Sequence, residues 1–159
     1  MIPILSIQGL DLEDPYFIFK LADRIAESVN VDDTPESAER LQALPQPWRY
    51  IAPLVAYYNE VNNGGHHQYF WNTQGVYRDL VAEGLKYYRA EAFERNYDEA
   101  LRLYRPDLYD IAQGASYEAY DQASRADRFD QQDRCFYATR PKLTEVLSKE
   151  VREGKDGYQ

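Results

Sequence analysis

The chain has 159 residues, of which 27 are acidic and 18 are basic, so its formal net charge is -9 at pH 7. Its hydrophobic fraction of 44% and aromatic fraction of 14% are typical of a packed globular protein, and this length suits one domain. A surface this negative repels phosphate groups, so we expect no direct binding to nucleic acid or to an anionic membrane. The charge favours a basic protein as partner.

The cysteine content and the amino terminus indicate a cytoplasmic protein. The single cysteine, Cys135, has no partner for an internal disulfide, which suits a reducing compartment. It lies in a helical apolar context, so we expect a buried structural thiol. The amino-terminal stretch lacks the basic start of a signal peptide, and no stretch approaches the roughly 18 apolar residues of a membrane span.

Apolar residues recur at helical spacing along almost the whole chain. The predicted helices, in chain order, cover about 15–29, 33–44, 48–62, 76–89, 92–105, 111–126 and 129–151, and the last is kinked or split at Pro141. Only residues 2–7 have a pattern compatible with a short extended edge. We therefore predict an all-α fold: a single compact domain of about seven or eight helices over residues 1–153, with residues 154–159 as a frayed tail.

Local signals predict how three of these helices begin, bend and end. Asp14 precedes Pro15 as an N-cap, and Asp33 caps the next helix while Glu36 reaches back to it. Pro53 should bend the helix that contains it, because proline lacks the N–H that would bond back along the helix. The run 62–65, Asn-Asn-Gly-Gly, is expected to stop that helix, and an aromatic turn follows at 68–71.

The chain offers few residues for catalysis. His66 and His67 are its only histidines, and neighbours in sequence are poorly placed to bind one metal ion together. We interpret them as part of a loop, with one histidine packed or bonded to backbone and the other in water. The sequence has no glycine-rich nucleotide-binding loop and no Gly-x-Ser-x-Gly motif. We expect no metal site, no cofactor and no catalytic residue.

The negative charge is concentrated in two parts of the chain. Residues 1–47 hold nine acids against three bases, and residues 106–135 hold seven against three, whereas the remainder is close to neutral. The acids that we expect to contact a partner are Asp11, Glu13, Asp14, Asp32, Asp33, Glu36, Glu39, Asp121, Asp127, Asp130 and Asp133. Carboxylates at i and i+4 of a helix lie about 5–6 Å apart, whereas duplex DNA carries one charge per roughly 1.7 Å of axis. A DNA-like surface therefore needs two or more acidic faces aligned.

The segment 60–72 carries a motif of the form Glu-Val-x-Asn-Gly-Gly-x-x-Gln-Tyr-Phe-x-Asn. It resembles the signature of a bacterial family of small acidic helical domains whose best-known type is a dimeric DNA-mimic protein. We interpret its residues as structural: Asn63, Gly64, Gly65, Gln68, Tyr69, Phe70 and Asn72. In this interpretation the first three turn the chain, Gln68 bonds to loop backbone, the two rings fill the junction between helices, and Asn72 caps.

The resemblance implies an all-helical fold and allows a homodimer. For the mimic type, it also implies that surface carboxylates occupy a DNA-binding protein such as a transcriptional regulator. Charge and motif together favour an acidic binding protein and not an enzyme. Two alternatives stay open: an immunity or antitoxin-like protein that blocks a toxin, and, ranked last, an enzyme centred on the loop 66–72.

Overall fold

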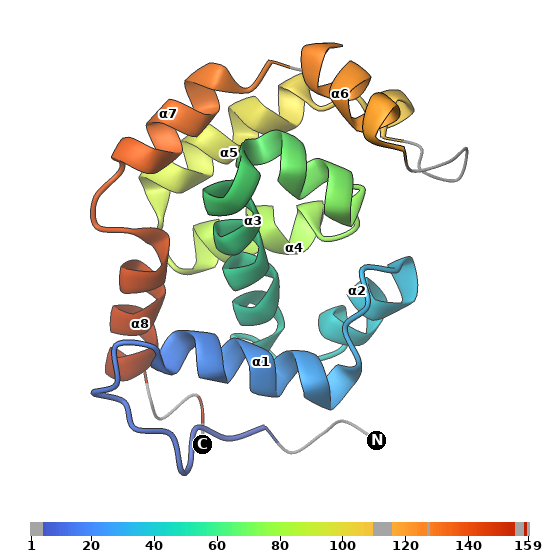
Figure 1. Cartoon of the computed structure of the whole chain (residues 1–159). Coiled ribbons are helices and arrows are strands. Elements are labelled where there is room, and N and C mark those ends of the chain that lie inside the picture. The colour runs from blue at the N-terminus through green and yellow to red at the C-terminus, as the bar shows by residue number, and fades with distance from the viewer. Residues whose placement is uncertain (1–4, 110–115, 127, 155–157, 159) are drawn as a thin grey trace.

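The computed structural model describes residues 5–109, 116–126, 128–154 and 158, and these form an all-α structure without strands (Figure 1). Its helices are α1 (Phe17–Val29), α2 (Pro35–Gln42), α3 (Trp48–Thr73), α4 (Arg78–Tyr87), α5 (Glu91–Leu103), the short 3₁₀ helix η1 (Pro106–Leu108), α6 (Tyr117–Ala126), α7 (Asp130–Ala138) and α8 (Leu143–Glu153). The predicted all-α fold is thereby confirmed, with eight α-helices among the described residues.

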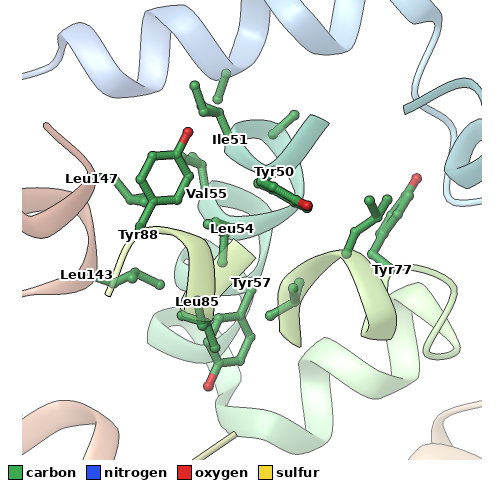
Figure 2. Packing of buried hydrophobic residues seen from close by; sticks show 14 of the residues in the cluster. Tyr50, Ile51, Leu54, Val55, Tyr57, Tyr77, Leu85, Tyr88, Leu143 and Leu147 are labelled. Carbon is green, nitrogen blue, oxygen red and sulfur yellow. The ribbon is translucent and has the colours of Figure 1, made fainter. Parts of the chain in front are cut away.

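Helix α3 runs through the middle of the molecule, with α1 across one end and α5 and α7 towards the other (Figure 1). Figure 2 shows the core around its first half, where Leu54 and Val55 lie among Leu85 of α4 and Leu143 and Leu147 of α8. Each of these five side chains is at most 4% exposed, and burying one such side chain contributes about 1.5–3 kcal/mol. Apolar burial around α3 therefore holds helices from both halves of the chain.

Close packing of α3 against α4 depends on Gly84. A Cβ atom at this position would lie 2.9 Å from both Leu54 Cδ1 and Tyr50 Cβ, closer than carbon atoms normally approach. The missing side chain thus lets the two helices approach each other directly, and this approach sets the position of the polar face of α4.

The two glycines of the motif interrupt α3 without ending it. Gly64 has φ -155° and ψ 24°, and Gly65 has φ 75° and ψ -178°, after which helical geometry resumes as far as Thr73. The prediction for 62–65 is correct in that helical geometry is interrupted there, but wrong in that the helix does not end there. Residues 68–71, predicted to form an aromatic turn, are helical. The backbone at Pro53 keeps helical torsions, so the interruption of α3 lies at the glycines.

Both predicted aspartate N-caps are wrong. Helix α1 begins at Phe17, and the Asp14 carboxylate accepts a hydrogen bond from the backbone N–H of Tyr16, one residue before the helix. Thr34 caps α2, because its Oγ1 accepts from the Ser37 N–H at 3.2 Å and proline fills the first helical position. Asp33 precedes this cap with a left-handed φ of 55°.

The last predicted helix is split as expected, with α7 ending at Ala138 and α8 beginning at Leu143. Tyr158, which lies in the expected frayed tail, is 3% exposed, and its hydroxyl lies 2.6 Å from that of Tyr88. The rest of 155–159 lies outside the described residues, as do 111–115 of the predicted sixth helix and 2–4 of the predicted edge. Residues 5–7 form no strand.

Candidate functional site

The acids predicted to contact a partner fall into three separate groups. The first precedes α1, the second surrounds α2, and the third lies on α6 and α7, while Asp127 lies outside the described residues. Helix α1 separates the first two groups by about 20 Å, since its 13 residues rise 1.5 Å each. Helices α6 and α7 lie at the far end of α3 from α1 (Figure 1). The described acids therefore do not form one continuous row.

Basic side chains are interspersed in the first group. Lys20 donates a hydrogen bond to Asp14, and this bond lowers the pKa of the Asp14 carboxyl below its usual value. Arg152 donates to the backbone carbonyl of Leu12 at 2.6 Å and lines the same shallow pocket as Glu13. Asp11 is exposed beside them. This local compensation makes the first group a weak candidate for binding a cation.

The third group is also partly neutralised. Asp121 pairs with Arg125 at 2.7 Å, one helical turn away on α6. Asp133, in the first turn of α7, faces the core and accepts hydrogen bonds from His66. Asp130 remains exposed at the start of α7. Asp133 therefore acts inside the fold, whereas Asp130 is available at the surface.

The second group adjoins a groove between α2 and α4, which we call the acidic groove. It is lined by Ala38, Glu39, Gln42, Val76, Asp79, Leu80 and Glu83. Three of these residues carry carboxylates and none is basic. Glu36 stands on α2 one turn before Glu39, and Asp32 and Asp33 lie just before that helix. Two helices thus present acids towards one groove.

Asp79 and Glu83 are site residues that the sequence did not identify. They lie in the stretch 48–105, which has equal numbers of acids and bases, so charge density gave no signal there. Both are exposed and one helical turn apart on α4, and this i, i+4 spacing was the available clue. Arg78 lies 3.8 Å from Asp79, and Arg40 lies 3.3 Å from Asp32. Neither arginine is among the residues that line the groove.

Tyr77 fixes α2 against the start of α4. Its side chain is 1% exposed, and its hydroxyl accepts a hydrogen bond from the Asp33 N–H at 2.9 Å (Figure 2). The same hydroxyl lies 2.7 Å from Ser37 Oγ. Because the Ser37 hydroxyl donates its hydrogen to the Thr34 carbonyl, Tyr77 is the donor in its bond with Ser37. Both walls of the acidic groove are therefore anchored to one buried phenol.

Like charges lie close together around Asp33. Desolvation raises the pKa of the Asp33 carboxyl, and the nearby carboxylates of Glu60 and Asp32 raise it further, against a lowering effect of Tyr77. The pKa of Asp32 is lowered, chiefly because Thr34 Oγ1 donates to it at 2.6 Å. The fold thus keeps carboxylates together here despite their mutual repulsion.

The family motif forms a bracket across the break in α3. Glu60 Oε2 accepts hydrogen bonds from Gln68 Nε2 at 2.9 Å and from Asn72 Nδ2 at 2.7 Å. The predictions that Gln68 bonds to loop backbone and that Asn72 caps are therefore wrong, and the part played by Glu60 was missed. Tyr69 and Phe70, which we interpret as filling a junction between helices, are both fully buried.

Both histidines are buried, so the predicted loop with one wet histidine is wrong. His66 is fully buried: its Nδ1 and its backbone N–H lie 2.6 and 2.9 Å from Asp133 Oδ1, and its Nε2 lies 2.8 Å from the Tyr57 hydroxyl. His67 lies beside the Tyr109 hydroxyl at 2.9 Å. Because Tyr57 is fully buried too, this chain of polar groups fastens α7 to α3 from inside the fold.

Cys135 is exposed, which corrects the expectation of a buried thiol. The face of α7 that meets the core passes through Gln132 and Phe136 instead. Within the described residues, no group of three or more His, Cys, Asp or Glu side chains is arranged to hold a metal ion. The helices described there are also all too short or too polar to cross a membrane.

Fold and site together define an acidic all-α protein whose surface carboxylates line a groove between two helices. The chain belongs to the DMP19-like family, because the family model described as "DMP19-like protein" matches residues 42–153. This is the DNA-mimic family whose signature the motif resembles. No curated protein matches the chain, and no solved structure does.

The matched segment begins at the last residue of α2 and contains all of α4. It therefore includes the motif and the groove acids Asp79 and Glu83. Glu39 of the opposite wall and its neighbour Glu36 on α2 lie before it. The acidic groove thus combines a wall from the family segment with a wall from outside it.

Proposed function

We propose that this chain is a DNA mimic whose acidic groove binds the basic surface of a DNA-binding protein, such as a transcriptional regulator, and keeps it from DNA. The observation that carries the proposal is the groove lining, with carboxylates from both helices and no basic side chain. Family membership supports the same function. The protein would act in the cytoplasm, as a binding protein and not as an enzyme.

The groove reproduces one property of duplex DNA. Phosphates flank each groove of DNA on two sides, and here Glu39 of α2 faces Asp79 and Glu83 of α4 across a groove that includes Leu80, while Glu36 lies one turn before Glu39 on α2. Arginine and lysine side chains that reach phosphates would meet carboxylates instead. A homodimer, which we include in the proposal, would present two such grooves.

The energetics require several contacts at once. An exposed ion pair contributes about 0.2–1 kcal/mol, so four carboxylates supply roughly 1–4 kcal/mol. Contacts with the apolar floor and with the flanking acids Asp32 and Asp33 would add to this. Because exposed charges are screened within about 8 Å at physiological ionic strength, binding should weaken as salt rises.

The proposal can be tested by capture and elution with DNA. The immobilised protein is exposed to a bacterial lysate, and retained proteins are released with a duplex oligonucleotide. The groove variant carries Glu36→Gln, Glu39→Gln, Asp79→Asn and Glu83→Gln. The matched control carries Asp23→Asn, Glu27→Gln, Glu91→Gln and Asp98→Asn, four exposed acids outside the groove lining. Each variant loses four negative charges, so the two have the same net charge.

We expect wild type and control to retain a DNA-binding protein that duplex DNA releases, and the groove variant to lose it. Equal retention by the groove variant would overturn the assignment to this groove. Retention of one enzyme that DNA does not release, and that loses activity when bound, would instead establish the immunity or antitoxin-like alternative.

A further inference from the structure

A second pocket lies where α3, α5, α7 and the start of α8 meet, on the side of the molecule away from α2 (Figure 1). We call it the basic-aromatic pocket, and it is lined by Tyr58, Asn62, Phe93, Phe136, Tyr137, Arg140 and Lys142. Four of its seven lining residues are aromatic and two are cationic, whereas none is acidic. Its chemistry is thus the opposite of that of the acidic groove.

The two cations have no ion-pair partner among the described residues, although the chain carries a net charge of -9. Arg140 Nη1 donates to the carbonyls of Tyr137 and Thr139 at 2.7 and 2.8 Å, which holds the guanidinium in place. Within the described part of the chain its other nitrogens have no hydrogen-bond partner. The nearby Glu145 carboxylate accepts from the backbone N–H of Lys142 at 2.6 Å. Two positive charges therefore remain available at the pocket.

The rings form a packed apolar wall. Phe136 contacts Phe93 edge-on with ring centroids 5.4 Å apart, and it contacts Tyr58 and Tyr137 at 6.0 Å each. The Tyr137 hydroxyl donates to the Val61 carbonyl at 2.7 Å, which fixes this ring at the pocket. Because these contacts set the ring positions in advance, a flat ligand could pack against them without reorganising the site.

We propose that the basic-aromatic pocket binds a small aromatic carboxylate, with its ring against Phe136 and Tyr137 and its carboxylate on Arg140 and Lys142. Ligand sites are mostly apolar with a few polar groups that orient the ligand, and a guanidinium binds a carboxylate with two parallel hydrogen bonds. The cavity of about 190 Å³ corresponds to about six liquid waters, which is room for one ring with its carboxylate. This inference does not depend on the acidic groove.

Benzoate is the probe, with benzamide as its neutral isostere and acetate as the anion without a ring. We expect benzoate to shift the amide resonances of residues 136–140 and 142 saturably, with a dissociation constant in the millimolar range for so few atoms. Benzamide and acetate should each bind at least about tenfold more weakly. Equal binding of benzamide, equal binding of acetate, or no saturable shift in this segment would each overturn the proposal.

Charge variants locate the binding groups. Arg140→Gln and Lys142→Gln should each weaken benzoate binding by about fivefold or more, as expected for the loss of one charged hydrogen bond. The control Lys149→Gln removes an exposed cation of α8 that does not line the pocket, and it should leave binding unchanged. Lys142 is informative even if Arg140→Gln perturbs the fold, because its side chain makes no hydrogen bond to the turn within the part of the chain that the structure describes. Unchanged binding in Lys142→Gln together with a folded, unaffected Arg140→Gln would refute the assignment.

Discussion

Substitution of Gly65 by alanine tests the link between the family motif and the buried polar chain. Gly65 has φ 75° and ψ -178°, a backbone region that essentially only glycine occupies. A Cβ atom there would lie 2.9 Å from Asp133 Cγ and would collide with its carboxylate. That carboxylate accepts both hydrogen bonds from His66. Gly65→Ala should therefore strain α3 and displace Asp133 from His66.

The expected loss in the free energy of unfolding caused by Gly65→Ala has two parts. The backbone strain amounts to about 1–3 kcal/mol. Loss of hydrogen bonds to a charged acceptor adds about 1.5–3 kcal/mol. A total of about 2.5–6 kcal/mol corresponds to a fall in Tm of roughly 5–24 °C for a domain of this length. Gly9→Ala is the control, because Gly9 has φ 78° with no atom within 4 Å of an added Cβ, so only a conformational cost of about 1 kcal/mol applies.

A double-mutant cycle separates collision from strain. The free energy of unfolding is measured by urea titration for Gly65→Ala, Asp133→Ala and the double variant. Once Asp133 is truncated, alanine at 65 has no carboxylate to displace, so the double variant should lose about 1.5–3 kcal/mol less than the two single losses combined. Additivity within about 0.5 kcal/mol would refute the coupling of these residues.

Three further predictions concern the groove and the core. Tyr77→Phe should destabilise the protein by about 1–2 kcal/mol and speed hydrogen exchange in α2, because one hydrogen bond to Ser37 of that helix and one to Asp33 just before it are lost; unchanged exchange would contradict the anchoring role of this phenol. Asp33→Asn should raise the free energy of unfolding at pH 7, because the raised pKa means that the folded state disfavours the charged carboxylate. This gain in stability should vanish below about pH 3.8, where the aspartate is protonated in both the folded and the unfolded state. A gain that does not depend on pH would exclude this cause. Burial raises the pKa of Tyr57 and Tyr97 well above the usual value of about 10, so the stability of the fold should be fully present below pH 10 and fall as the pH rises beyond it. Unfolding and the phenolate absorbance of these tyrosines should then appear together. Ionisation of all tyrosines in a protein that is still folded would contradict this prediction.

Local signals in the sequence predicted the helical content well. The split at Pro141 and the break at Gly64 and Gly65 follow from backbone rules that act within a few residues, and both occur. The N-cap of α2 was misassigned because two residues that both suit an N-cap, Asp33 and Thr34, stand side by side. The structure gives the cap to Thr34, and Asp33 has a left-handed φ while its backbone N–H donates to distant Tyr77.

The contents of the site depended on contacts between distant residues. His66 was expected in a loop because polar residues and glycines surround it, yet its partner Asp133 lies 67 positions away and compensates its burial. The groove acid Asp79 escaped notice because its own segment is neutral, and it joins Glu39 only through the packing of α4 beside α2. Charge counted along the chain therefore located one wall of the groove and missed the other.

The central claim is that the groove carboxylates take the place of DNA on a DNA-binding protein. Its most direct test is an operator-competition titration with the protein released by duplex DNA, in which fluorescence anisotropy follows a labelled operator while wild type, groove variant or control variant is added. We predict that wild type and control displace the operator competitively, and that the groove variant needs at least about fivefold higher concentration, since four exposed ion pairs amount to roughly 1–4 kcal/mol. Equal displacement by the groove variant, or a complex that holds protein, operator and this chain together, would contradict the claim.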